Sequence, residues 1–178
     1  MLLTTGERSA KRVMSYLEGT VLKDERIALG AKFFHCVRMD GDTLTEGHPL
    51  YSLVKGKKLP RCVLVSRDRS LVKKLEGKRI KASTLFAAMK AVARRDYKTS
   101  FTSYVAKMRK LLFEMDKLDQ QQKALERIKK AARAKPALKK KAQALEKKLK
   151  KWAERIDKTE KALNHFVLKP LKKVARAR

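Results

Sequence analysis

The chain has 178 residues, of which 47 are lysine or arginine and 18 are aspartate or glutamate, and its net charge is +29. This length suits one ordinary domain with an appendage. A hydrophobic content of 43% excludes a wholly disordered basic tail, and the excess of positive charge favours an anionic partner, which is nucleic acid, an acidic protein or an anionic membrane.

The sequence carries no sign of membrane insertion or export. No apolar run approaches the roughly 18 residues that span a bilayer, and the opening MLLTTGERSAKR lacks the apolar region of a signal peptide. We therefore expect a cytoplasmic protein without a transmembrane segment. Its two cysteines, Cys36 and Cys62, are expected to be reduced thiols in that compartment.

The character of the sequence changes near Asp96. All seven glycines lie in the first 80 residues, among short apolar runs. After Asp96 there is no glycine, and proline occurs only at Pro136 and Pro170. This pattern is typical of a globular segment followed by long helices. We therefore predict two domains, residues 1–96 and 97–178.

The first domain consists of short apolar segments separated by turn-forming residues. Apolar spacing predicts a helix over 10–27, and the apolar run that ends at Asp40 predicts a buried strand over 33–39. Residues 67–70 form a predicted tight turn between two strands. The predicted order is a short strand at 1–5, a helix at 10–27, a strand at 33–39, a short helix within 45–60, two strands within 61–77 and a helix within 81–96.

This order of elements resembles the thioredoxin-like superfamily. The resemblance is carried by the strand FFHCVRMD with its terminal acid, by LPRCVLVS, by the hairpin RDRSLVKKLEG and by the closing helix. Pro60 stands where that family has a cis-proline, and only bonds that precede proline readily become cis. The resemblance covers about residues 2–95 and implies a minimal α/β thioredoxin-like fold.

The redox enzymes of that family carry Cys-X-X-Cys at the start of the first long helix. The corresponding region here, TTGERSAKR, contains no cysteine. Thiol–disulfide exchange needs a low-pKa attacking thiolate and a resolving partner, so we predict a redox-inactive domain. Cys36 and Cys62 are expected to be buried structural thiols, and a redox role for Cys62, two residues after Pro60, is the alternative.

The second domain has the apolar spacing of two paired helices. Apolar residues recur at alternating steps of three and four, which is heptad spacing, and each series predicts a helix of about 32 residues, or about 48 Å. Because proline is tolerated only in the first turn of a helix, Pro136 marks the start of the second helix, and Pro170 its end. We predict an antiparallel coiled-coil hairpin with its turn near Pro136. Its apolar seam, the face that each helix turns to the other, consists of Phe101, Tyr104, Met108, Leu111, Met115, Leu118 and Leu125, then Leu138, Ala142, Leu145, Leu149, Trp152, Ile156, Leu163 and Phe166, with polar breaks at Gln122 and Thr159.

The sequence around the expected turn concentrates positive charge. Residues 123–151 contain thirteen basic and two acidic residues, a net charge of +11. Solvated helices usually pair glutamate with lysine one turn apart, whereas mutual repulsion among unpaired lysines is relieved by an anion. The pattern favours an anion-binding arm over a solvated spacer or an oligomerising coil. The predicted phosphate-binding residues are Lys129, Lys130, Arg133, Lys135, Lys139, Lys140, Lys141, Lys147, Lys148, Lys150 and Lys151.

Signals of catalysis are sparse. His35, His48 and His165 are scattered, and the sequence has no zinc-site spacing, glycine-rich phosphate loop or Gly-X-Ser-X-Gly elbow. We predict no enzymatic activity, no metal and no cofactor. Aromatic residues that could stack on a base are sparse, and Tyr97 is the one candidate outside the seam. Binding through phosphates, largely blind to sequence, is therefore expected.

Several functions remain as hypotheses. The leading one is a non-catalytic nucleic-acid-binding protein whose basic arm contacts the phosphates of DNA or structured RNA. One alternative is a protein-interaction scaffold with an acidic protein partner or with self-association through the coiled coil; another is a thiol redox protein that uses Cys62. Binding of an amphipathic helix to an anionic membrane is the weakest hypothesis, because the apolar seam is already occupied.

Overall fold

The computed structural model divides the chain into two compact units. It describes residues 1–5, 11–41, 45–56, 58–132 and 137–170. Unit 1 comprises Met1–Val105 and Phe166–Arg178, and unit 2 comprises Ala106–His165. The chain therefore leaves unit 1, forms unit 2 and then returns to unit 1.

Two long helices dominate the second half of the chain. The first, α5 (Phe101–Ala132), has 32 residues as predicted, and the second, α6 (Ala137–Leu163), has 27. α6 ends well before Pro170, so the predicted stop at that proline is wrong. The unit boundary lies inside α5 rather than after Asp96, because the first turn of α5 packs in unit 1.

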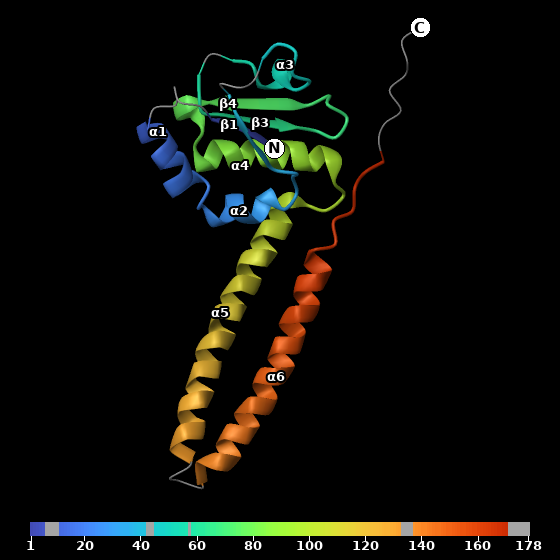
Figure 1. The fold of residues 1–178 in the computed structure, drawn as a ribbon. Helices are drawn as coiled ribbons and strands as arrows, with labels where there is room; N and C mark the ends of the chain where they lie inside the picture. Colours follow the sequence, from blue (N-terminus) through green and yellow to red (C-terminus); the bar gives the residue numbers. More distant parts are fainter. Residues whose placement is uncertain (6–10, 42–44, 57, 133–136, 171–178) are drawn as a thin grey trace. The chain divides into compact units, whose positions relative to one another are not determined.

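Unit 1 is built on a four-stranded mixed sheet (Figure 1). The strands β1 (Leu2–Thr5), β2 (Val37–Asp40), β3 (Arg61–Val65) and β4 (Val72–Glu76) lie in the order β2-β1-β3-β4. β1 pairs in parallel with β2, and β3 pairs antiparallel with both β1 and β4. β3 lies between β1 and β4 and is buried over four of its five residues, Arg61 among them. The Leu59–Pro60 peptide bond just before it is cis.

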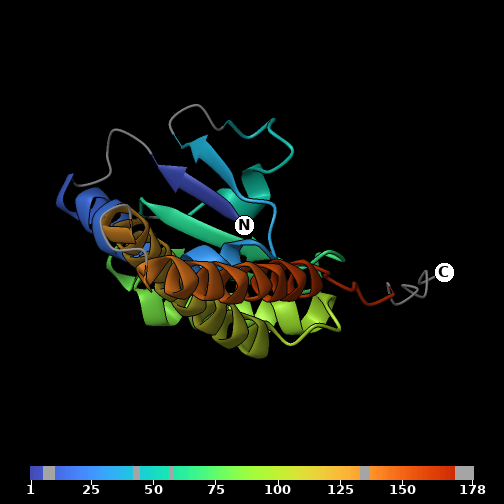
Figure 2. The ribbon, with the colours of Figure 1, turned by 90° about the horizontal axis from the view of Figure 1, so that it is seen from below.

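Helices cover both faces of this sheet (Figures 1 and 2). α4 (Ala82–Asp96) packs against β3 and β4, and α2 (Glu25–Ala31) packs on α4. The short α3 (Tyr51–Val54) contacts β3 on the opposite face. The closing helix and the short helix are thus confirmed. Three apolar residues at helical spacing on α4 are fully buried: Leu85, Met89 and Val92.

The predicted single helix over 10–27 is divided in two. α1 (Lys11–Tyr16) passes into a π-helical turn, η1 (Leu17–Val21), and α2 begins after Asp24. Asp24 Oδ1 accepts a hydrogen bond of 2.9 Å from the Arg26 amide, which makes this aspartate the N-cap of α2. Apolar spacing alone does not reveal that a capping residue starts a new helix here.

An aromatic cluster around Phe33 joins four segments of unit 1. The Phe33 ring packs edge-on against Tyr97, Phe101, Tyr104 and Phe166, with ring-centroid distances of 5.0, 5.2, 5.1 and 4.5 Å. The Tyr97 hydroxyl also donates a hydrogen bond of 2.8 Å to the Phe33 carbonyl. Such pairs stabilise a core beyond the area that they bury. The cluster therefore holds the segment before β2, the end of α4, the start of α5 and the chain after α6 in one core.

This cluster corrects two predictions. β2 begins at Val37 rather than at Phe33, because the Phe33 side chain is taken into the core. Phe101, Tyr104 and Phe166, which heptad spacing placed on the helix seam, pack in unit 1 instead. Helical periodicity shows that these positions are apolar but does not show which core they enter.

Backbone hydrogen bonds fix the chain after α6 to the linker between α4 and α5. The Lys98 amide donates to the Val167 carbonyl at 2.8 Å, and the Lys169 amide donates to the Asp96 carbonyl at 2.7 Å. An antiparallel β-bridge lies between these two bonds. The returning chain is therefore held by its backbone as well as by the Phe166 ring.

The turn between β3 and β4 is organised by Asp68. Its Oδ1 accepts hydrogen bonds from the hydroxyls of Ser66 at 2.7 Å and Ser70 at 2.6 Å. Its Oδ2 accepts one of 2.8 Å from Nη2 of Arg95, which lies on α4. The Arg95 guanidinium, followed by these serines, holds the pKa of Asp68 well below its ordinary value. The predicted turn is thus both confirmed and joined to a helix.

In unit 2, α5 and α6 lie side by side and run in opposite directions (Figures 1 and 2). Their buried residues are all predicted seam positions: Met108, Leu111, Leu118 and Leu125 on α5, and Ala142, Leu149 and Ile156 on α6. Within the described residues, no helix is long and apolar enough to cross a membrane.

We expect Phe33→Ala to lower the free energy of unfolding by about 3–5 kcal/mol, because it removes every ring contact at the centre of the cluster. Urea denaturation followed by circular dichroism measures this loss. Phe113→Ala is the matched control, because the Phe113 ring is 59% exposed and its removal should cost less than about 1 kcal/mol. Equal losses for the two variants would contradict the central role of Phe33.

We expect Asp68→Asn to lower the thermal unfolding midpoint at neutral pH, because the amide keeps the shape of the side chain but not its charge. A depressed pKa means that the carboxylate stabilises the fold fully above the ordinary pKa of 3.8. This contribution is lost progressively as the pH falls below that value. The difference between wild type and variant should therefore shrink below about pH 4. Asp119→Asn, at an exposed position of α5, is the control, and a pH-independent difference for Asp68→Asn would contradict the ionic role.

Candidate functional site

Positive charge is distributed unevenly along unit 2. The tip region, which we define as residues 123–151, has thirteen basic and two acidic residues and a net charge of +11. The remainder of the unit, residues 106–122 and 152–165, has seven basic and six acidic residues and a net charge of +1. The charge of unit 2 is thus almost confined to its tip region.

Acidic side chains offset the basic ones in the remainder of unit 2. Arg155 Nη2 lies 3.9 Å from Glu114 Oε2 on the facing helix. Lys161 Nζ lies 2.8 Å from Asp157 Oδ2 one turn earlier on α6. Such exposed pairs contribute little to stability, but they leave this part of the unit with little net field for an anion.

In the tip region both carboxylates converge on a single lysine. Lys129 Nζ lies 2.9 Å from Glu146 Oε1 and 3.8 Å from Glu126 Oε1. These are the only two acidic residues of the tip region. The hydrogen bond that Lys129 donates to Glu146 is the main cause of the raised pKa of this lysine. Among the predicted phosphate-binding residues, Lys129 therefore links α5 to α6 rather than presenting a free charge.

The other predicted binding residues that the structure describes are exposed. They are Lys130, Lys139, Lys140, Lys141, Lys147, Lys148, Lys150 and Lys151. Within the described ranges, none of them has a carboxylate within ion-pair distance. Arg133 and Lys135 lie outside the described residues, as does Pro136, and α6 begins directly after that proline at Ala137.

Two further basic residues belong to the same region. Lys123 and Arg127 are exposed on α5 within the tip region, although they were not among the predicted binding residues. Both are included in the charge count over residues 123–151. A selection by distance from the turn omits them.

Three lysines of α6 form a row on one face of the helix. Lys140, Lys147 and Lys151 follow one another at steps of seven and four residues, which bring side chains to the same face. They stand two residues away from the buried Ala142 and Leu149, a rotation of about 200° that places them opposite the seam. The row is about 16 Å long, the length of about five phosphates along one strand of a duplex.

Tyr97, the sequence candidate for stacking on a base, lies in unit 1 rather than in the tip region, and its side chain is half-buried. Its ring packs against Phe33 with a centroid distance of 5.0 Å, and its hydroxyl is bonded to the Phe33 carbonyl. Burial raises the pKa of this tyrosine. The candidate site therefore consists of basic side chains without an aromatic platform from Tyr97.

The two cysteines differ in accessibility. Cys62 is 2% exposed on the central strand β3, whereas Cys36 is exposed. The prediction of two buried thiols is wrong for Cys36, because β2 starts only after it. Burial raises the pKa of Cys62 to about 12, so this thiol is protonated at neutral pH and is a poor nucleophile. This geometry gives no support to a redox role for Cys62.

Comparison of the chain with protein families, curated proteins and solved structures gave no match. Nor do the described residues contain a group of three or more histidine, cysteine, aspartate or glutamate side chains that could hold a metal ion. Function is therefore inferred from the charge, exposure and geometry of the side chains themselves.

We expect one thiol of the native protein to react rapidly with an aromatic disulfide reagent and the second only after denaturation. Cys36→Ser should abolish the rapid reaction, because Cys62 is buried and protonated. Cys62→Ala should leave the rapid reaction intact and serves as the matched control. Rapid labelling of Cys62 in the folded Cys36→Ser variant would contradict its burial and reopen the redox alternative.

Proposed function

We propose that this chain is a non-catalytic nucleic-acid-binding protein whose helical arm, unit 2, contacts phosphates through its tip region without reading base sequence. The observation that carries this proposal is the convergence of both tip carboxylates on Lys129, which leaves a concentrated set of exposed lysines. The partner is DNA or structured RNA, both of which present closely spaced phosphates.

The physical basis of the proposal is counterion release. Lysines held near one another repel, and a polyanion relieves that repulsion while its own condensed counterions return to solution. Contacts to phosphates fix position on a nucleic acid, whereas sequence is read by side chains that reach base edges. The tip region presents ammonium groups on flexible side chains, which suit contacts to phosphates rather than the reading of base edges.

The pairing of α5 with α6 supports an arm that can present these charges. Buried residues recur at steps of seven on each helix, which favours an antiparallel coiled coil: Leu111, Leu118 and Leu125 on α5, and Ala142, Leu149 and Ile156 on α6. We include that arrangement in the proposal. Gln122, the single polar position in the apolar seam of α5, is exposed.

Unit 1 is proposed to be a redox-inactive thioredoxin-like domain that anchors the arm. This is supported by the order of its elements, by the strand order β2-β1-β3-β4 with one parallel pair, and by the position of Pro60 immediately before β3. The absence of Cys-X-X-Cys from the sequence and the burial of Cys62 favour an anchoring role over thiol chemistry.

We expect replacement of the lysine row by glutamine, K140Q/K147Q/K151Q, to weaken binding to duplex DNA and to structured RNA alike, whatever their sequence. The slope of log K against log salt should fall by about one for each lysine removed. Fluorescence anisotropy of the full chain across a salt series measures both effects. Glutamine is nearly as good a helix former as lysine, so the arm should persist.

The matched control is K107Q/K110Q/K158Q, which removes the same charge from exposed positions in the remainder of unit 2. We expect a much smaller change of slope for this variant. Equal losses for both variants would mean that bulk charge, and not the tip region, carries binding. If the wild type binds neither nucleic acid at about 0.15 M salt but binds an acidic protein, the scaffold hypothesis replaces this proposal.

A further inference from the structure

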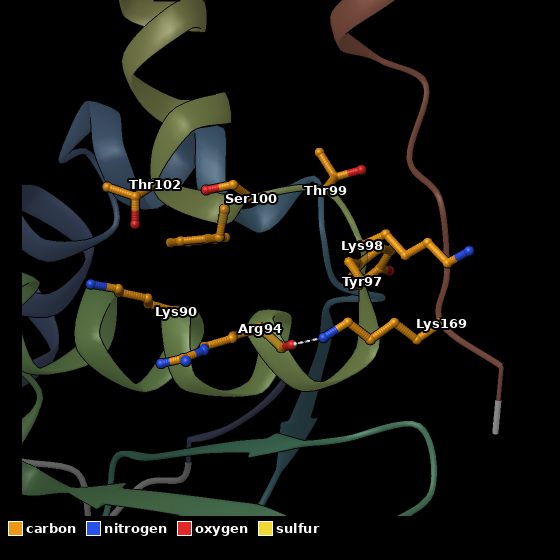
Figure 3. Close-up of a pocket in the computed structure, with 9 residues that line it drawn as sticks. Lys90, Arg94, Tyr97, Lys98, Thr99, Ser100, Thr102 and Lys169 are labelled. Atoms are coloured by element: carbon orange, nitrogen blue, oxygen red, sulfur yellow. Dashed lines mark hydrogen bonds between the residues drawn. The ribbon is translucent and has the colours of Figure 1, made fainter. Parts of the chain in front are cut away.

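A second basic feature lies in unit 1, outside the arm. A cavity of about 360 Å³ opens between α4, the linker that follows it and the first turn of α5 (Figure 3). Four of its nine lining residues are cationic, namely Lys90, Arg94, Lys98 and Lys169, and none is acidic. The same cavity wall carries the hydroxyls of threonine and serine residues from the linker and α5.

Lys90 and Arg94 form the cationic floor of this cavity. They lie one turn apart on α4, and Figure 3 shows both side chains extending to the same side, below Ser100 and Thr102. Both are exposed, and within the described residues neither has a carboxylate at ion-pair distance. In the same view the Lys98 ammonium points to the other side, so Lys90 and Arg94 are the principal pair.

Hydrogen bonds to the backbone fix the walls of the cavity relative to one another. Lys169 Nζ donates a hydrogen bond of 2.7 Å to the Arg94 carbonyl, which Figure 3 shows as a dashed line. The linker is bonded to the returning chain on both sides of Tyr97, as described above. The nearby carboxylate of Asp96 accepts a hydrogen bond of 2.9 Å from the Arg67 amide and does not line the cavity. The cations therefore surround a formed space that no acidic side chain of the described residues neutralises.

The chemistry of the lining favours a phosphate monoester. Such a group carries a charge close to −2 and three acceptor oxygens, which match two cations on the same side of α4 and the neighbouring hydroxyl donors. An arginine contacts two of these oxygens at once, and its hydrogen bonds to an anion are stronger than neutral ones. The volume lies at the small end of the range of about 300–1,000 Å³ for small-molecule sites, so the cavity suits one nucleotide and not a duplex.

We propose that this cavity binds the terminal phosphate of a nucleic-acid strand, with Lys90 and Arg94 contacting the phosphate oxygens. The choice of nucleic acid rests on the proposed function of the arm, whereas the cavity and its charges belong to unit 1 alone. The chain then makes two kinds of phosphate contact. The arm binds internal phosphodiesters at many positions, and the cavity binds one strand end.

The test compares one single-stranded oligonucleotide in two forms, with a 5′-phosphate and with a 5′-hydroxyl, each labelled at the 3′ end. Anisotropy titrations with the full chain should show about tenfold tighter binding of the phosphorylated form. The variant K90Q/R94Q should lose this preference. K11Q/R12Q, which removes one lysine and one arginine from exposed positions of α1, should keep it. A nucleoside 5′-monophosphate should compete for the preference in the wild type, and inorganic phosphate should compete more weakly.

Equal binding of the two forms by the wild type would overturn the inference, as would loss of the preference in K11Q/R12Q or failure of the nucleoside monophosphate to compete. These outcomes are separable from failure of the arm. If the arm proposal alone fails, K140Q/K147Q/K151Q leaves the affinity for both forms unchanged. If the cavity inference alone fails, that variant still weakens both forms and the ratio between them is one in every protein.

Discussion

The packing of four rings around Phe33 is the interaction on which the arrangement of this chain depends. Tyr97 follows α4, Phe101 and Tyr104 lie in the first turn of α5, and Phe166 follows α6. All four rings contact Phe33. The segments that precede and follow unit 2 in the sequence therefore pack in the core of unit 1. Close packing also shapes α2, because a Cβ at Gly30 would lie 2.7 Å from the Phe101 ring, so only glycine allows the helix to approach this closely.

The distribution of acidic side chains determines where the positive charge of unit 2 is left without a partner. Acidic residues are nearly as numerous as basic ones in the remainder of the unit, whereas the tip region has two carboxylates and both contact Lys129. One lysine thus takes a structural role and the others stay exposed. An exposed lysine without a partner breaks no ion pair when it contacts a phosphate, which supports the proposal that the tip region is where unit 2 binds a polyanion.

Unit 1 combines a buried sheet with a basic surface cavity, and the role that we propose for it is binding rather than thiol chemistry. Cys62 lies on the central strand with its pKa raised by burial, so the thiol contributes to packing. Lys90 and Arg94, by contrast, are exposed and line a surface cavity. In the proposed arrangement, the buried sheet holds unit 1 rigid, and the basic side chains at its surface bind the phosphate.

The sequence by itself determined several local features: the order of the four strands of unit 1, the short helix and the closing helix among them, the 32 residues of α5 and the buried seam positions such as Leu118 and Leu149. It also determined the concentration of charge in the tip region. These features depend on residues within a few turns of one another, which periodicity and composition record directly. Only the tertiary structure decided that Phe33 packs with Phe166, that Lys129 takes both tip carboxylates, and that Lys90 and Arg94 line a cavity with Lys169. Those contacts join residues far apart in the chain, and the path that brings them together depends on caps and turns, such as Asp24 and Asp68, whose effect no periodic pattern carries.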